Sequence, residues 1–350
     1  MTILVYEHVT GGGLAGRALP ASWAAEGSAM RRAIAADFAA VPGVRVVVTL
    51  DPRFAADPLP GVECRNIDPS GLGSLAASAD HTVLIAPEAE GLLEALAGEV
   101  EAAGGRLLGP GREAVALVAD KLGLAHLLTA NGVPTPPTCA LGPSPSDFPS
   151  DWPGPLVVKP RRGAGALDTF VVPGRRSPAG MPLDRSFVVQ PYLSGEPRSG
   201  TFLIDRDGLP TLLAVGLQRI QVDGAGRISY QGGTILGGDE AAPPAVWKAL
   251  GVVGRSVPGG SLRGFVGVDY LVDDRGRATV LEVNPRPTTS YVGLAKFWPP
   301  GTVAGAWLAA CEGPLAGTDW PDRLRLTRAA RPVRFDADGT IRDEPGDPRR

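Results

Sequence analysis

The segment GFVGVDYLVDDRGRATVLEVNPRP, residues 264–287, places two carboxylates inside runs of apolar residues. A tight turn centred on Arg275-Gly276 would pair two strands so that Asp269 lies opposite Glu282, and strand alternation puts Asn284 on the same face. Two buried carboxylates roughly 5 Å apart repel each other unless a cation neutralises them. Oxygen ligands without histidine or cysteine suit Mg²⁺ bound together with nucleotide phosphates, whereas the alternative is a plain hairpin whose acids face solvent.

A second group of candidate residues is basic. Lys159 ends the apolar run PLVVKP and precedes the loop RRGAGA, whose small residues include Gly163 and Gly165. Backbone N–H groups of such a loop can close over phosphates, while a lysine supplies a compact positive charge. Lys121, in a helical stretch, is another candidate for phosphate contact. Either lysine could instead be a solvated surface charge, an alternative that suits Lys121 better than Lys159.

The segment SFVVQPYLSGEPRSGTF, residues 186–202, has the pattern of a strand, a bend and another strand. An adenine ring needs an apolar slot and one or two backbone hydrogen bonds, which a hinge at Gln190, Tyr192 and Leu193 can provide. Glu196 lies just beyond this hinge, where a carboxylate could hold ribose hydroxyls. A simple β-hairpin turn is the alternative interpretation.

The N-terminal run ILVYEHVTGGGLAG can be written as the dinucleotide fingerprint G-x-G-x-x-G. In that fingerprint the third glycine opens a helix, and an acid follows about 20 residues later at the end of the next strand. Here Pro20 places the helix start beyond Gly16, and the next strand, VRVVVTLD, ends only at Asp51. The run therefore favours a loop after the first strand of an α/β domain, and an NAD-dependent oxidoreductase remains an alternative.

Strands and helices alternate through the first third of the chain, which predicts a parallel sheet covered by helices. One helix carries Trp23, Met30, Ile34 and Phe38 on a single stripe. A helical stretch over about 112–130 precedes the linker VPTPPT, and the sequence after it is rich in strands. We expect one helix near 244–256, a short hairpin around FDADGTI and a frayed C-terminal tail. The predicted fold class is α/β followed by α+β.

The composition excludes several classes of protein. The 350 residues carry a formal charge of −3, with basic residues scattered along the chain, so nucleic acid is not an expected partner. Cys64, Cys139 and Cys311 are far apart and lack metal-ligand spacing, which is typical of buried thiols in a reducing compartment. No apolar run approaches the roughly 20 residues that cross a bilayer. We therefore expect a cytoplasmic protein that binds neither membrane nor nucleic acid.

The order of these motifs resembles the ATP-grasp superfamily: a lysine, a linker, a lysine with a glycine loop, a hinge with a glutamate, and Asp…Glu-x-Asn-Pro-Arg. The resemblance implies an N-terminal substrate domain over 1–115, a small ATP-clamping lobe over 116–190, a large lobe over 191–312 and an extension over 313–350. It implies the following contacts: Lys121, Lys159, Gly163 and Gly165 with ATP phosphates, Gln190, Tyr192 and Leu193 with adenine, Glu196 with ribose, Asp269, Glu282 and Asn284 with magnesium. Arg286, together with Lys159, would act on the transferred phosphate.

The motifs VYEHVTGGG, SYQGGT and EVNPRPTTSYVGL are similar to those of the ATP-grasp ligases that join tyramine to the side-chain carboxyl of L-glutamate in methanofuran-type cofactor synthesis. The resemblance implies an ADP-forming carboxylate–amine ligase that uses ATP and Mg²⁺, with Mn²⁺ as an alternative metal, and it is compatible with a homodimer. The implied contacts with the amino-acid and amine substrates are Glu7, His8, Gly12, Gly13 and Arg219. Another ATP-grasp amino-acid or peptide ligase and a non-catalytic ATP-binding subunit remain alternatives.

Overall fold

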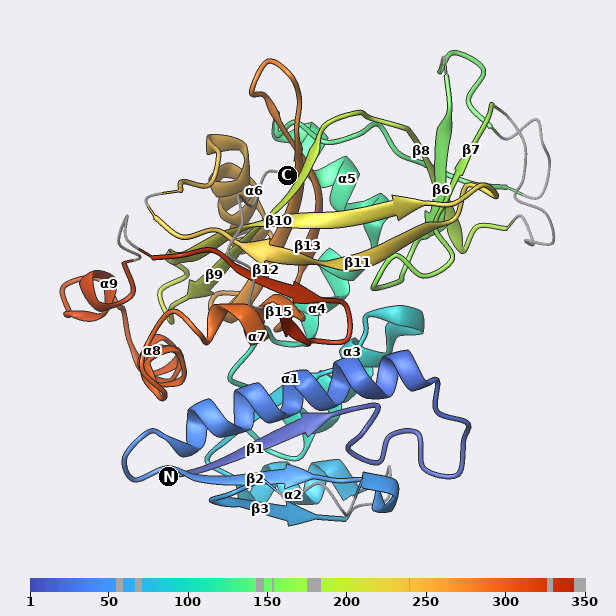
Figure 1. Ribbon diagram of the computed structural model, residues 1–350. Coiled ribbons are helices and arrows are strands. Elements are labelled where there is room, and N and C mark those ends of the chain that lie inside the picture. The colour runs from blue at the N-terminus through green and yellow to red at the C-terminus, as the bar shows by residue number, and fades with distance from the viewer. Residues whose placement is uncertain are drawn as a thin grey trace.

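The computed structural model in Figure 1 describes most of the chain. The described residues are 1–54, 59–66, 71–142, 148–152, 154–174, 184–238, 240–325 and 330–342. They form one parallel and two antiparallel sheets, so the predicted change from α/β to α+β along the chain is confirmed. The end of the tail that we expected to fray, after residue 342, lies outside the described residues.

The N-terminal domain is a parallel sheet with the strand order β3-β2-β1-β4. Its strands are β1 (Thr2–Glu7), β2 (Arg45–Thr49), β3 (Val62–Arg65) and β4 (His81–Ile85), and its helices are α1 (Ala21–Ala39), α2 (Leu72–Ser78) and α3 (Leu92–Ala102), with short 3₁₀ turns η1 (Pro52–Phe54) and η3 (Ala89–Gly91). β1 and β4 are buried along almost their whole length, as expected for parallel strands covered on both faces. The sequence analysis missed β3, whose four residues carry no apolar run.

Helix α1 begins at Ala21, directly after Pro20, so the predicted start is confirmed. Its side chains Met30, Ile34 and Phe38 are buried, but Trp23 is 38% exposed and does not join the stripe that packs against β1 and β2. Because α1 starts well beyond Gly16, the glycines do not open a helix as the dinucleotide fingerprint requires. The NAD alternative loses its structural basis.

The predicted helix over 112–130 is two helices, α4 (Arg112–Ala119) and α5 (Lys121–Ala130). Asp120 between them is extended, and its side chain accepts hydrogen bonds from the backbone N–H groups of Leu122 and Gly123. An aspartate competes in this way with helix continuation and caps the next helix instead. The break orients the first residue of α5, Lys121.

The small lobe is a four-stranded antiparallel sheet with the order β5-β8-β6-β7. Its strands are β5 (Cys139–Ala140), β6 (Leu156–Pro160), β7 (Phe170–Val172) and β8 (Phe187–Pro191). Leu156, Val158, Val172 and Val189 form part of a separate small core with Leu141 and Phe148. In Figure 1 this lobe lies at one end of the large antiparallel sheet.

The large lobe is a seven-stranded antiparallel sheet with the order β13-β12-β9-β10-β11-β14-β15. Its elements are β9 (Glu196–Ile204), β10 (Pro210–Val222), β11 (Ile228–Ile235), α6 (Pro244–Arg255), β12 (Gly264–Val272), β13 (Ala278–Asn284), α7 (Ser290–Leu294), α8 (Thr302–Glu312), α9 (Trp320–Arg323), β14 (Val333–Asp336) and β15 (Ile341–Arg342). Helix α6 and the hairpin around FDADGTI are therefore confirmed. The hairpin extends the large sheet at its edge.

One hydrophobic core joins the N-terminal domain to the large lobe. It includes Phe38 from α1, Trp307 from α8 and Phe265 from β12, with ring centroids 5.4–5.5 Å apart. Figure 1 shows α1 between the N-terminal sheet and the large lobe. A shared core of this kind fixes the relative position of the two units, so residues from both can build one site.

The cysteines differ from the expectation that all three are buried thiols. Cys64 is exposed because it lies on the short edge strand β3, while Cys139 and Cys311 are half-buried. All three thiols are free. Within the described residues, no helix is both long enough and apolar enough to span a membrane.

Candidate active site

The β12–β13 hairpin has the predicted register at the candidate site but not next to the turn, where Tyr270 pairs with Val280 and a bulge at Leu281 makes up the difference. Asp269 pairs with Glu282, and the connecting turn is closed by a backbone hydrogen bond from the Asp273 N–H to the Arg277 carbonyl oxygen. Asn284 donates its side-chain N–H to Asp269 over 2.9 Å. The three oxygen-bearing side chains proposed as metal ligands therefore lie together, whereas their binding of magnesium remains a prediction.

The carboxylate of Asp269 is enclosed by polar neighbours. Gln218 from β10 donates its Nε2 hydrogen to Asp269 Oδ1 over 2.8 Å, a contact that the sequence analysis missed because β10 is distant in the chain. Burial and the negative charge of Glu282 raise the pKa of Asp269 to about 6. Because burial and a neighbouring negative charge disfavour the ionised form of Asp269, a nearby cation would stabilise that form.

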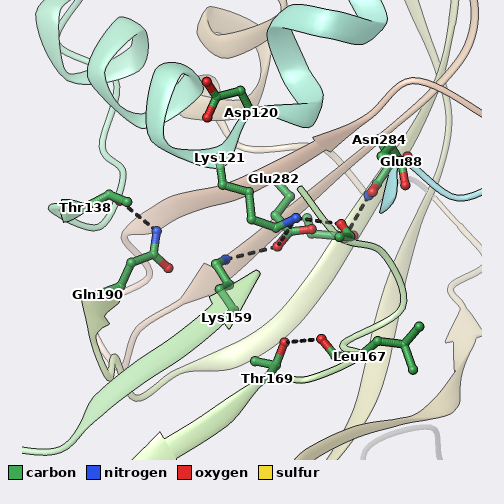
Figure 2. Close-up of polar contacts among 12 residues, drawn as sticks. Glu88, Asp120, Lys121, Thr138, Lys159, Leu167, Thr169, Gln190, Glu282 and Asn284 are labelled. Carbon is green, nitrogen blue, oxygen red and sulfur yellow. Dashed lines mark hydrogen bonds and ion pairs between the residues drawn. The ribbon is translucent and has the colours of Figure 1, made fainter. Parts of the chain in front are cut away.

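Two lysines from different elements converge on Glu282, as Figure 2 shows. Lys159 Nζ from β6 lies 3.0 Å from Glu282 Oε1, and Lys121 Nζ from α5 lies 3.8 Å from the same oxygen. Burial would raise the pKa of Glu282, but the charges of Lys121 and Lys159 more than offset it and hold that pKa below its ordinary value. Both lysines are largely buried, so neither is a solvated surface charge.

The loop RRGAGA, residues 161–166, is held by ion pairs on both sides. Arg161 binds the Asp120 carboxylate through two nitrogens, at 2.6 and 2.5 Å, and Arg162 Nη1 lies 2.7 Å from Glu94 Oε2 of α3. Lys121 Nζ also donates to the carbonyl oxygen of Gly163 over 2.6 Å. The loop thus lies directly over the two lysines.

The hinge between β8 and β9 offers free backbone donors. The N–H of Tyr192 donates to Pro155, and the side chain of Gln190 donates to Thr138 (Figure 2). Among the described residues, the backbone N–H of Leu193 has no protein acceptor. The N–H groups of Ser194 and Gly195 are likewise without an acceptor in the described part of the chain, so Leu193 is the residue with a free N–H only when compared with Tyr192. The Glu196 carboxylate lies 2.5 Å from Arg198 Nε.

Arg286 forms a buried pair with a residue that the sequence analysis did not select. Its Nε and Nη2 atoms lie 2.9 and 3.1 Å from the two oxygens of Glu88, which follows β4 in the N-terminal domain. A charged residue just after the carboxyl end of a buried parallel strand is the signal that could have indicated Glu88. Each terminal nitrogen of Arg286 keeps one further hydrogen, since Nη1 makes only a 3.3 Å contact with Pro287. That free edge can bind an anion.

The predicted substrate residues at the end of β1 and in the loop after it contact one another and their neighbours in the chain. The Glu7 carboxylate accepts hydrogen bonds from the N–H groups of Val9 and Thr10 and from the Thr10 hydroxyl. His8 lies 3.3 Å from the Tyr6 hydroxyl, and burial lowers the pKa of His8. Gly13 packs against the His8 ring, and Gly12 has a positive φ of 103°. Contacts of Glu7, His8, Gly12 and Gly13 with a substrate remain predictions.

Arg219 lies next to Gln218 but bonds elsewhere. A register irregularity follows Gln218, and Arg219 Nη2 donates to Asp336 Oδ1 over 2.6 Å and to the carbonyl oxygens of Gln231 and Phe335. The guanidinium thereby holds β14 against β11. The described structure does not bring Arg219 into the group formed by Asp269, Glu282 and the two lysines.

The donor set fits magnesium bound with phosphates. Within the described residues, no group of three or more His, Cys, Asp or Glu side chains could hold a metal by itself. Two carboxylates and one amide oxygen are hard ligands, and Mg²⁺ is commonly held by one or two carboxylates while phosphates and water complete its octahedron. Asp269, Glu282 and Asn284 are therefore suited to a metal that arrives with ATP.

Comparison with protein families identifies the class to which this fold and site belong. A model of the ATP-grasp domain matches residues 118–290, and a model of the pre ATP-grasp 3 domain matches residues 44–115. Together these matches cover well over half of the chain. The chain belongs to the ATP-grasp superfamily.

Two curated relatives carry the same name. The chain is 27% identical over 215 residues to tyramine–L-glutamate ligase of Methanocaldococcus jannaschii, covering 61% of this chain and 58% of that protein. The corresponding ligase of Methanocaldococcus fervens is 26% identical, with 61% of each chain covered. The chain thus spans about three fifths of the length of the curated relatives it matches.

Solved structures share the fold. An ATP-grasp superfamily protein from Archaeoglobus fulgidus superposes with a TM-score of 0.69 at 20% identity, covering 95% of this chain and 92% of that chain. D-alanine–D-alanine ligase from Bacillus anthracis, solved with ATP, gives a TM-score of 0.58 at 17% identity, covering 89% and 97%. A biotin carboxylase domain from Hydrogenobacter thermophilus, solved with MgADP, gives 0.63 at 14% identity, covering 94% and 71%.

Proposed function

We propose that this protein is an ATP- and magnesium-dependent ligase that joins a carboxylate to an amine and releases ADP. The observation that carries the proposal is the arrangement of Lys121 and Lys159 around Glu282, beside Asp269 and Asn284. This places cationic donors for phosphates next to oxygen ligands for a metal. The proposed partners are small molecules of the cytoplasm.

The reaction would proceed in two steps. An oxygen of the substrate carboxylate attacks the γ-phosphorus of ATP, the bond to the bridging oxygen breaks, and ADP leaves an acyl phosphate behind. The neutral amine then attacks the acyl carbon, phosphate leaves, and the proton of the amine passes to it. Magnesium, when bound, would neutralise the phosphate oxygens between which this charge moves.

The side chains of this protein would bind and orient the reactants. Lys121 and Lys159 are held near Glu282, where they would bind phosphates, and the free N–H of Leu193 would bind adenine. The outer edge of Arg286 would hold the acid substrate, its phosphorylated form and the oxyanion formed when the amine attacks. The loop at 161–166 would exclude water from the acyl phosphate.

We propose L-glutamate and tyramine as the first substrate pair. Support comes from the two curated relatives named tyramine–L-glutamate ligase and from the motifs VYEHVTGGG and EVNPRPTTSYVGL. This chain covers only part of the matched relatives. A screen must therefore distinguish L-glutamate and tyramine from other amino acids and amines that could enter the same reaction.

The test is a screen of ADP release by the full chain with MgATP, pairing amino acids with amines. We expect ADP release that requires both an acid and an amine, with tyramine and L-glutamate forming an amide identified by mass spectrometry. ADP release with a different pair would retain the ligase and replace the substrates. ATP binding without ADP release for any pair would favour a non-catalytic ATP-binding subunit.

A further inference from the structure

Helix α1 presents one stripe of residues to the large lobe. Asp37, near its end, accepts hydrogen bonds from the Tyr291 hydroxyl over 2.7 Å and from the backbone N–H of Ala304 over 2.9 Å. Two turns earlier, Ala29 lies directly under the turn at Gly339. Residues spaced by three or four share one face of a helix, so this stripe continues to Glu26 and then to Trp23.

Glu26 lies where the stripe reaches the segment that follows Arg286. Its Oε1 atom accepts a hydrogen bond from the hydroxyl of Thr289. Within the described residues Glu26 makes no ion pair, although it attracts Arg286 at longer range; Arg286 itself pairs with both carboxylate oxygens of Glu88. Two carboxylates, Glu26 and Glu88, thus share one guanidinium, and the net negative charge that remains favours binding of a further cation.

Aromatic side chains flank this carboxylate. Trp23, one turn before Glu26, is 38% exposed although it continues a stripe that is otherwise docked. Tyr230 of β11 lies near Glu26 and Asp269: burial, followed by the charges of Asp269 and Glu26, raises the pKa of its hydroxyl. In Figure 1 the first turns of α1 lie on the side of the molecule where β6, β7 and β8 are found.

We propose that Glu26 and Trp23 form the binding subsite for the amine substrate, which is a primary amine carrying an aromatic ring. The Glu26 carboxylate binds the ammonium group, and the Trp23 indole packs against the ring. The subsite places the amine beside the free edge of Arg286, where the acyl group is to be attacked. This inference rests on the proposed function, since it assigns one of its two substrates to a place in the fold.

The test measures equilibrium binding to the full chain in the presence of magnesium and a non-hydrolysable ATP analogue. The probes are tyramine, its neutral isostere 2-(4-hydroxyphenyl)ethanol, and butylamine, which lacks the ring. The parent should prefer tyramine to the alcohol by about tenfold or more, the usual value of a charge-assisted hydrogen bond. Glu26→Gln should abolish that preference, because Gln keeps an acceptor for Thr289 but carries no charge.

Controls separate the subsite from general effects on the fold. Glu113→Gln, an exposed carboxylate on α4, should leave all three affinities unchanged. Trp23→Ala should weaken tyramine by about tenfold but leave butylamine unaffected, whereas Trp247→Ala, at a tryptophan of similar exposure on α6, should change neither. Thermal unfolding of each variant verifies that it is folded.

Two results would overturn the inference: equal binding of tyramine and the alcohol by the parent, or an unchanged preference in Glu26→Gln. ADP release by the parent is measured in parallel. Charge-dependent binding of tyramine without ADP release would retain the subsite and overturn the ligase proposal. ADP release by the parent, with tyramine binding unchanged in both variants, would retain the ligase proposal and overturn the subsite.

Discussion

The charge of Glu282 is shared by two lysines from different elements, so a substitution there tests the proposed phosphate site most directly. Glu282→Gln keeps the shape of the side chain but leaves Lys121 and Lys159 without their counter-charge and removes an anionic metal ligand. We expect kcat to fall by at least about a hundredfold with the fold retained. Steady-state ADP release and thermal unfolding measure the two effects.

The control is Asp274→Asn, which removes an exposed carboxylate from the turn of the same hairpin. Its activity should equal that of the parent. Activity of Glu282→Gln within tenfold of the parent would show that Glu282 does not support catalysis.

Thiol reactivity provides a second prediction for single residues. Burial raises the pKa of the Cys311 thiol to about 12, so at pH 8 only about one thiol in ten thousand is ionised. Cys64 is exposed on β3. We expect iodoacetamide to modify Cys64 first and Cys311 at less than a tenth of that rate, as mass spectrometry of a time course would show. Equal rates at pH 8 would contradict the burial of Cys311.

At the scale of elements, the end of β4 is tied to the end of β13 by the pair of Glu88 and Arg286. Removing one partner of a buried pair leaves the other charge uncompensated. Glu88→Ala should therefore lower the free energy of unfolding by about 3–5 kcal/mol, as measured by urea denaturation. Glu113→Ala on α4 should change it by less than about 0.5 kcal/mol, the usual limit for an exposed site. Similar small losses in both variants would show that the pair is not coupled to folding.

The glycine loop after β6 supports another prediction at this scale. Gly165 has a φ of 66°, a conformation that side chains rarely adopt, and a Cβ on Gly163 would lie 3.0 Å from Pro160. Replacing both by valine should distort the loop over Lys121 and Lys159, and admit water to the acyl phosphate. We expect more ADP released per amide formed, and a larger loss of turnover than of unfolding free energy. An unchanged ADP-to-amide ratio would show that these glycines only shape the backbone and do not help to exclude water.

Short-range patterns explain which elements could be predicted. The start of α1 followed from Pro20. The pairing of Asp269 with Glu282 was predicted from a turn within one hairpin, but it also depends on a bulge at Leu281 that alternation does not indicate. Glu88 follows β4 and Gln218 lies on β10, and both are distant in sequence from the residues they contact, so no local pattern indicates which partners they meet. The helical stretch over 112–130 has the predicted ends, but its break at Asp120 was not predicted, because the capping contacts of Asp120 outweigh helix propensity there.

At the scale of the whole molecule, the site is assembled from the N-terminal domain and both lobes. Lys159 comes from the small lobe, Asp269 and Glu282 come from the large lobe, and Glu88 and Glu26 come from the N-terminal domain. The N-terminal domain shares a core with the large lobe, whereas the small lobe has a core of its own. Movement of the small lobe against the other two is therefore the motion that the packing resists least.

The ion pair between Arg162 of the glycine loop and Glu94 of α3 links the small lobe to the N-terminal domain. We expect Glu94→Gln to loosen closure, because the loop loses its charged contact with α3 while the contact of Arg161 with Asp120 remains. Amide exchange of residues 161–168 should become faster with MgATP and acid substrate bound, and uncoupled ATP hydrolysis should rise severalfold. Glu90→Gln, on an exposed carboxylate close to Glu94 in sequence, serves as the control and should change neither. Unchanged exchange in Glu94→Gln would show that the loop is held by Asp120 and Lys121 alone, and that the N-terminal domain does not take part in closure.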